Sequence, residues 1–269
     1  MTLKTKLAGV RAIRQFDNWI QIIVNRLMFP GTGCIVYRKG DVEMIVDHLG
    51  GDANGVRECL TSPMYRDLIE ILVKRSAKKI RNVLDIGANG GGFALLNHLM
   101  GVPLKQLVCV EMNPRVFGRL SFNLYQNLRG VSLTLIQGAI AAKPGSVEVS
   151  LGRGSTGESL VSETSNPGKA EQIKLLSLDD IVTQSFANDA FIDLCKIDVE
   201  GAEYEVFLKA ECKSACRIYY LIIEIHTVVD FSRDDLIARL NSLGFDDISP
   251  KPKSEEAVFL FQNRTLPGH

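Results

Sequence analysis

The chain has 269 residues, of which 46% are hydrophobic, enough for one large α/β domain with an N-terminal extension or for two small domains. Its 31 lysines and arginines balance 31 aspartates and glutamates, so no overall field favours nucleic acid, and we expect no nucleic-acid partner. No signal peptide, no bilayer-spanning run and no cysteine pattern of a zinc site is visible, which favours a soluble, reduced, cytoplasmic protein.

Residues 1–60 are expected to form an extension of a main domain that covers residues 61–269. The extension begins with apolar positions typical of one or two helices and continues with a hairpin whose strands lie at 35–37 and 42–46. A flexible, glycine-containing loop is expected at 50–55. We expect the extension to dock on the main domain, contact the substrate or form a homodimer contact; the alternative for its first helix is peripheral attachment to a membrane.

The main domain begins with a glycine-rich turn between a strand and a helix. Residues 83–86 form a short aliphatic run typical of a strand buried on both faces, with Asp85 inside it. Four glycines follow between positions 87 and 92, and glycines allow a sharp turn and close approach to a ligand. The helix expected over 93–99 directs its free N–H groups at the turn. These features predict a site for an anionic group of a nucleotide-like cofactor.

The spacing of this turn favours S-adenosylmethionine over a dinucleotide. Asn89 stands where a dinucleotide fingerprint has its second glycine, and the pattern Asp-x-Gly-x-Asn-x-Gly fits residues 85–91 better. S-adenosylmethionine has no pyrophosphate; Asp85 suits its ammonium group, and the helix N-terminus suits its carboxylate. Glu111 ends the next strand 20 residues after Gly91, where a carboxylate can bind both ribose hydroxyls. An NAD(P)-dependent oxidoreductase and a non-catalytic module of the same fold remain alternatives.

Strands and helices alternate through the rest of the chain, which predicts an α/β fold with a doubly wound, Rossmann-like sheet and helices on both faces. Gly138 and Ala139 follow one of these strands, where small side chains leave room for an adenine ring. A segment over 152–169, rich in Gly, Ser and Thr, is expected to be a mobile loop over the site. The expected helices cover 63–79, 93–99, 114–128 and 232–243, with a further helix start at 177, and the expected strands cover 83–86, 107–111, 131–136, 147–149, 173–176, 191–199, 219–226 and 258–261.

Five motifs occur in the order of a known family: D-I-G-A-N-G-G at 85–91, E-M-N-P at 111–114, S-L-D-D-I at 177–181, K-I-D-V-E-G-A-E at 196–203 and E-I-H at 224–226. Over about residues 60–262 the chain thus resembles the FkbM-type S-adenosylmethionine-dependent methyltransferases. The resemblance implies the seven-stranded methyltransferase sheet and methyl transfer to a hydroxyl of a small-molecule, glycan or glycolipid acceptor. The residues expected to bind the cofactor are Asp85, Gly87, Asn89, Gly91, Glu111, Met112, Gly138, Ala139 and Asp198.

The chain departs from the family pattern at two positions of the turn. Members usually carry a larger residue at position 90 and an aromatic one after Gly91, where this chain has Gly90 and Gly92. The departure concerns the stiffness of the turn and leaves the expected fold unchanged.

The expected catalytic residues are His226, Asp198 and Lys196, which stand at the carboxyl ends of two central strands. A hydroxyl is a weak nucleophile at neutral pH, so a general base should assist transfer. His226 is the first candidate, because its ordinary pKa suits that task; Asp198 is the second, and Lys196 pairs with it. We expect no metal, although the alternative is that Asp198, Glu224 and His226 hold Mg²⁺ to acidify the hydroxyl.

Overall fold

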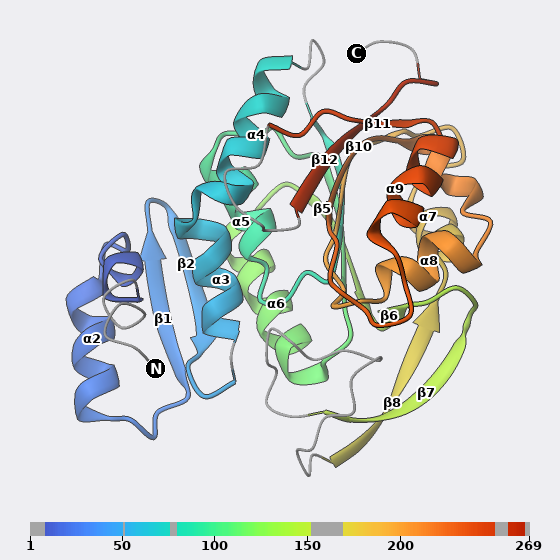
Figure 1. Cartoon of the computed structure of the whole chain (residues 1–269). Helices are drawn as coiled ribbons and strands as arrows, with labels where there is room; N and C mark the ends of the chain where they lie inside the picture. Colours follow the sequence, from blue (N-terminus) through green and yellow to red (C-terminus); the bar gives the residue numbers. More distant parts are fainter. Residues whose placement is uncertain (1–8, 51, 76–79, 152–168, 251–257, 267–269) are drawn as a thin grey trace.

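The computed structural model describes residues 9–50, 52–75, 80–151, 169–250 and 258–266 (Figure 1). Its helices are α2 (Trp19–Met28), α3 (Asp52–Thr61), α4 (Pro63–Arg75), α5 (Gly92–Leu99), α6 (Pro114–Asn127), α7 (Leu178–Ser185), α8 (Glu203–Lys209) and α9 (Arg233–Ser242), with the 3₁₀ helix η1 (Lys213–Arg217). Its strands are β1 (Cys34–Lys39), β2 (Val42–Asp47), β3 (Asn82–Ile86), β4 (Gln106–Glu111), β5 (Ser132–Gln137), β6 (Ala139–Ile140), β7 (Gly145–Leu151), β8 (Lys169–Leu176), β9 (Ile192–Ile197), β10 (Ile218–Glu224), β11 (Phe245–Asp247) and β12 (Val258–Asn263). In this described part of the chain, no helix has the length and apolar composition that a bilayer-spanning segment requires.

Seven strands form the central sheet, in the order β11-β12-β10-β9-β3-β4-β5. The strands from β10 to β5 are parallel, whereas β12 runs antiparallel to both β10 and β11. The chain winds outward from β3 to β5 on one side and from β9 on the other, so the strand order reverses between β3 and β9. Open sheets of this kind bind ligands at the carboxyl ends of the strands beside such a reversal. The structure confirms the doubly wound seven-stranded sheet.

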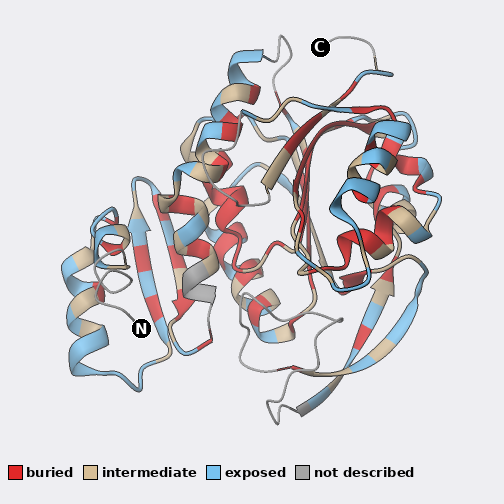
Figure 2. Cartoon of the chain, in the orientation of Figure 1, coloured by how far each residue is buried: buried red, intermediate tan, exposed pale blue. Residues whose placement is uncertain are grey.

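Helices cover both faces of this sheet, with α4, α5 and α6 on one face and α7, α8 and α9 on the other (Figure 1). Successive strand side chains point to opposite faces. Val83 of β3 therefore packs in the cluster with α4–α6, and Leu84 and Ile86 pack in the cluster with α7–α9. Because both faces are covered, the central strands are buried along their length (Figure 2).

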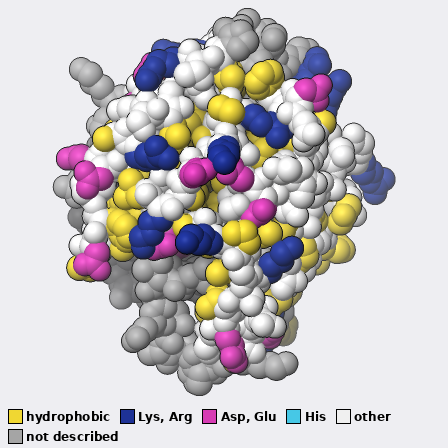
Figure 3. Space-filling model, turned by 90° about the vertical axis from the view of Figure 1, so that its right-hand side faces the viewer, with side chains coloured by type: hydrophobic (Ala, Val, Ile, Leu, Met, Phe, Trp, Pro, Cys, Tyr) yellow, Lys and Arg dark blue, Asp and Glu magenta, His cyan; other side chains and the backbone are white. Residues whose placement is uncertain are grey.

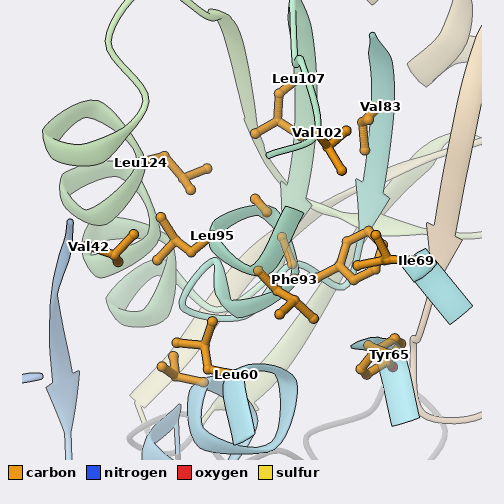
Figure 4. Close-up of a cluster of buried hydrophobic side chains, with 14 of the residues drawn as sticks. Val42, Leu60, Tyr65, Ile69, Val83, Phe93, Leu95, Val102, Leu107 and Leu124 are labelled. Carbon is orange, nitrogen blue, oxygen red and sulfur yellow. The ribbon is translucent and has the colours of Figure 1, made fainter. Parts of the chain in front are cut away.

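The segment before β3 packs on the α5 and α6 side of the sheet. β1 and β2 form the predicted antiparallel hairpin. Asn123 of α6 holds this hairpin, because its amide accepts a hydrogen bond from the Ile45 N–H at 2.7 Å and donates one to the Ile45 carbonyl at 3.1 Å. Figure 4 shows Val42 of β2 and Leu60 of α3 in the same buried cluster as the residues of α4, α5 and α6. The hairpin and α3 thus share a hydrophobic core with the main sheet.

The structure corrects the loop predicted at 50–55, because α3 begins at Asp52. Val56 and Leu60 are completely buried, and this burial outweighs the low helix propensity of Gly55. Gly55 also faces the turn after β3: a Cβ at this position would lie 3.1 Å from Cγ of Asn89. Tertiary packing therefore makes a helix of a segment that reads locally as a loop.

A second, three-stranded sheet has the order β6-β8-β7. β7 pairs antiparallel with β8 and contains the strand predicted at 147–149. The mobile loop predicted over 152–169 lies, apart from Lys169, outside the described residues.

Candidate active site

A cavity opens at the carboxyl ends of β3, β4, β9 and β10, beside the reversal of strand order. Its lining brings together most of the predicted site: Gly87, Asn89, Glu111, Met112, Gly138, Ala139, Lys196 and Asp198. Three other predicted residues, Asp85, Gly91 and His226, lie outside the lining. The topology thus joins motifs that are more than 100 residues apart in the sequence.

The turn after β3 has a backbone that requires its glycines. Gly87 has a φ of +76°, and a Cβ there would lie 1.8 Å from the carbonyl oxygen of Asp198. Gly91, with a φ of +89°, is the N-cap of α5; it lies outside the cavity lining, and a Cβ there would lie 3.0 Å from Cδ2 of Leu124. Since only glycine adopts such positions without strain, Gly87 brings the backbone to the cavity, and Gly91 starts the helix behind it.

Glu111 connects the ends of β3 and β4. One carboxylate oxygen accepts a hydrogen bond from the Asn89 N–H at 3.0 Å, and the other accepts one from the Asn113 N–H at 2.8 Å. The side chain is only 9% exposed, and it lines the cavity. The turn and the carboxylate expected at the ribose therefore hold each other in place.

Small side chains line the cavity next to Glu111. Ala139 is buried in a small cluster that Met112 packs against. A Cβ on Gly138 would lie 2.9 Å from the carbonyl oxygen of Lys174, so this position accepts no side chain without a shift of β8. The result is a smooth apolar surface beside the glutamate, as an adenine ring requires.

Lys196 lies buried between the glycine turn and the acidic end of the cavity. Its Nζ is 2.8 Å from the Gly87 carbonyl oxygen, 3.2 Å from Oδ2 of Asp198 and 3.5 Å from Oδ1 of Asp85. Burial alone lowers the pKa of this ammonium group, but the carboxylates of Asp198 and Asp85 outweigh burial and raise the pKa. Lys196 therefore stays charged and orients its neighbours rather than accepting a proton. Asp85 lies fully buried behind it, so its influence on the cavity passes through Lys196.

The acidic end of the cavity is formed by Asp198, after β9, and Glu224, at the end of β10, with His226 beside them. Nε2 of His226 lies 3.9 Å from Oδ1 of Asp198, 3.8 Å from Oε1 of Glu224 and 3.4 Å from Oε2 of Glu200. Its Nδ1 lies 2.9 Å from Oε1 of Glu203, a fully buried carboxylate. The imidazole is thus held between one buried acid and three acids at the cavity.

The charges of this cluster alter the proton affinities of its members. Burial lowers the pKa of His226, but the hydrogen bond and charge of Glu203, followed by the charges of Glu200 and Asp198, raise it to about 9. Burial, followed by the charge of Asp198, raises the pKa of Glu224 to about 7. The pKa of His226 differs from the ordinary value assumed from the sequence, so the imidazole is protonated at neutral pH while no ligand occupies the cluster.

Tyr65, Cys59 and Glu58 line the cavity from α3 and α4 and were missed from the sequence. Tyr65 follows the helical spacing of a core position, and it is 2% exposed. Its hydroxyl donates to Oε2 of Glu224 at 3.1 Å, with Oδ2 of Asp198 at 3.4 Å. Burial, followed by the charge of Asp198, raises the pKa of this phenol, so it remains a donor. No local pattern distinguishes this tyrosine from a purely structural one.

Comparison with known families gives one match. The model of a family described as the Methyltransferase FkbM domain matches residues 85–246. This range contains the glycine turn, Glu111 and the acidic end of the cavity, but not α3 and α4. No curated protein matches the sequence.

Several solved structures are similar to this chain at low identity. One is methyltransferase FkbM from Methylobacillus flagellatus KT, with 17% identity, coverage of 68% of this chain and 44% of the other, and a TM-score of 0.45. Another is TrmK from M. capricolum in complex with S-adenosyl-homocysteine, with 12% identity, coverage of 74% and 68%, and a TM-score of 0.41. A third is the hMettl16 catalytic domain in complex with the MAT2A 3′UTR hairpin 1, with 13% identity, coverage of 75% and 69%, and a TM-score of 0.43. The chain matches less than half of the length of the Methylobacillus protein.

Proposed function

The chain belongs to the FkbM methyltransferase domain family, and from this premise we propose that it is an S-adenosylmethionine-dependent O-methyltransferase acting on a hydroxyl of a small-molecule, glycan or glycolipid acceptor. The observation that carries the proposal is the arrangement of one cavity, which has Glu111 and the glycine turn at one end and Asp198, Glu224 and Tyr65 at the other. The two ends suit a cofactor and a hydroxyl-bearing acceptor, respectively.

The first end fits S-adenosylmethionine by its shape and its donor set. Glu111 is oriented to accept hydrogen bonds from the ribose hydroxyls, and Met112, Gly138 and Ala139 offer the apolar surface for the adenine ring. The backbone of Gly87 lines the cavity, and a Cβ there would collide with the carbonyl oxygen of Asp198. When bound, S-adenosylmethionine supplies an electrophilic methyl group on its sulfonium.

At the other end, the residues of this chain position the acceptor and receive its proton. Lys196 holds Asp198 through one carboxylate oxygen, which leaves Oδ1 to accept a hydrogen bond from the acceptor hydroxyl. We assign Asp198 and His226 as the groups that orient and deprotonate this hydroxyl. Because His226 is protonated at neutral pH while the cluster has no ligand, Asp198 is the first acceptor of the proton under those conditions.

The charge of the cavity favours an acceptor without phosphate groups. Within the described part of the chain, five carboxylates line it, those of Glu58, Glu111, Asp198, Glu200 and Glu224, against the single ammonium group of Lys196. A phosphodiester would be repelled by this surface, whereas a neutral polyol would not. The face shown in Figure 3 has basic and acidic side chains interspersed, with no extended basic stripe. These observations support a hydroxyl of a sugar or small molecule over a nucleic acid.

Thermal unfolding with and without ligands tests the cofactor. A ligand at about 100 times its dissociation constant adds roughly 2.7 kcal/mol to stability, which raises the melting temperature by a few degrees. We expect this rise with S-adenosylmethionine and S-adenosylhomocysteine and no rise with NAD. Transfer of a labelled methyl group to glycans, glycolipids and RNA then tests the acceptor. A rise with NAD alone would contradict the cofactor, and transfer to RNA alone would contradict the acceptor.

A further inference from the structure

Three potential ligand atoms converge at the acidic end of the cavity. Nε2 of His226, a carboxylate oxygen of Asp198 and a carboxylate oxygen of Glu224 all lie within 4.8 Å of one another. Oδ1 of Asp198 and Oε1 of Glu224 are 3.9 Å and 3.8 Å from Nε2 of the imidazole. A cation about 2.1 Å from each atom separates its ligands by about 3.0–3.6 Å, so small side-chain movements close this triad around an ion.

Each of the three side chains is held from behind by a different residue. Glu203 accepts from Nδ1 of His226 at 2.9 Å, Lys196 lies 3.2 Å from Oδ2 of Asp198, and Tyr65 donates to Oε2 of Glu224 at 3.1 Å. The atom of each ligand that faces the centre is therefore the one not used by its partner. A histidine whose other nitrogen donates to a carboxylate is the usual arrangement of a metal ligand, since that bond fixes both the tautomer and the ring orientation.

The charge around the triad gives an independent reason for a cation. Asp198, Glu200, Glu203 and Glu224 gather around His226, and Glu203 is fully buried. Among the described residues, Oε2 of Glu203 is a buried oxygen without a hydrogen-bond partner. These four carboxylates, one buried and three half-buried, outnumber the two basic side chains among them, Lys196 and His226, and such an excess of poorly solvated negative charge favours a positive ligand. Lys196 supplies one permanent positive charge to this group.

We propose that Asp198, Glu224 and His226 bind a divalent cation, and that its open coordination positions take the acceptor hydroxyl. The mixed set of one imidazole and two carboxylates suits Mn²⁺, Zn²⁺ or Fe²⁺ better than Mg²⁺, which prefers oxygen ligands. A cation here would hold and acidify the hydroxyl, and Asp198 and His226 would then serve as its ligands in place of the proton-accepting role that we assign to them in the ion-free cluster. This role rests on the proposed function, whereas binding of the ion does not.

Mn²⁺ binding to the purified full-length chain, measured by the loss of the free-ion signal in electron paramagnetic resonance, tests the proposal. We expect one ion per chain, with S-adenosylhomocysteine absent or saturating. Asp198→Asn and His226→Gln should weaken binding by at least about 10-fold, and the positioning variants Glu203→Gln and Tyr65→Phe by about 10-fold or more. The matched control is Asp41→Asn, which breaks the exposed pair between Asp41 and His98 and should leave binding unchanged. Thermal unfolding of each variant verifies that it is folded.

Three results would overturn the cation site. The first is no Mn²⁺ binding at millimolar concentration, and the second is unchanged Mn²⁺ affinity in folded Asp198→Asn or His226→Gln. The third is loss of Mn²⁺ binding when S-adenosylhomocysteine saturates the chain, which would mean that the cofactor occupies the cluster. Because the measurement needs no turnover, the two proposals fail separately. If the chain binds S-adenosylhomocysteine but does not bind Mn²⁺, the cation site is wrong and the proposed function stands. If it binds Mn²⁺ but neither S-adenosylmethionine nor S-adenosylhomocysteine, the proposed function is wrong and the cation site stands.

Discussion

The α-carbon of Gly87 is packed against the backbone of Asp198, so closely that a Cβ on Gly87 would lie 1.8 Å from the Asp198 carbonyl oxygen. Gly87 belongs to the turn after β3, and Asp198 follows β9 on the neighbouring strand. The Asp198 N–H donates to the Ile86 carbonyl at 3.1 Å, which locks the two strand ends together. The glycine turn and the acidic end of the cavity are therefore held in a fixed position relative to each other.

Gly87→Ala should destabilise the protein far more than the same substitution at a glycine that is required only for its positive φ. We expect it to lower the free energy of unfolding by more than about 3 kcal/mol, because strain and a backbone clash add. Gly101→Ala is the matched control: its φ is +72°, but no atom lies within 4 Å of the added Cβ. It should cost about 1–2 kcal/mol. Urea unfolding measures both, and equal losses would refute the close contact.

Glu111→Ala should weaken S-adenosylhomocysteine binding at least about 10-fold, because it removes the proposed ribose ligand and leaves two backbone N–H groups without their acceptor. Isothermal titration calorimetry measures the affinity. Glu70→Ala, at an exposed position of α4, is the control and should bind normally. Normal binding by the Glu111 variant would remove this residue from the cofactor site.

Gly92→Ala should displace α3 from the cavity. The added Cβ would lie 3.0 Å from Cβ of Cys59 and 3.1 Å from Cα of Val56, and the backbone of α3 has to move to accept it. We expect a lower melting temperature and weaker S-adenosylhomocysteine binding. Gly118→Ala, in an open position of α6, should instead stabilise by about 0.5–1 kcal/mol. If the two variants have the same melting temperature and the same affinity for S-adenosylhomocysteine, the position of α3 does not depend on the absence of a Cβ at Gly92.

His48 should make the N-terminal hairpin region sensitive to acid. Burial, followed by the charge of Arg26, lowers the pKa of this histidine to about 4. Between about pH 6.5 and pH 4 the unfolded chain binds a proton that the folded chain does not, so stability is lost as the pH falls through this window. His48→Phe should reduce the fall in melting temperature from pH 6.5 to pH 5. Parallel curves for the two proteins would contradict the lowered pKa.

Cys59 should be unreactive although it lines the cavity. Burial raises the pKa of its thiol, so little thiolate forms near neutral pH. With iodoacetamide at pH 8, peptide mass spectrometry should show alkylation of the exposed Cys34 and Cys216 well before Cys59. Modification of Cys59 at the same rate would indicate a reactive thiol in the cavity wall.

The sequence alone determined the alternation of strands and helices in the main sheet, the glycine turn and the strand ends that carry Glu111, Asp198 and Glu224. These features follow from apolar periodicity, glycine spacing and the position of acids after a buried strand, all of which depend on residues close together in the chain. The resemblance to the FkbM family rests on the same motifs and is confirmed over residues 85–246.

Only the tertiary structure decided how the site is assembled and charged. It made α3 a helix and brought Tyr65 to within 3.1 Å of Glu224, 159 positions away. It also placed Glu203 behind His226 and so raised the pKa of the imidazole. A side chain's burial and charged neighbours are set by segments far apart in sequence, and local patterns carry no information about them. That is why the strand ends that form this cavity could be predicted and the protonation of its residues could not.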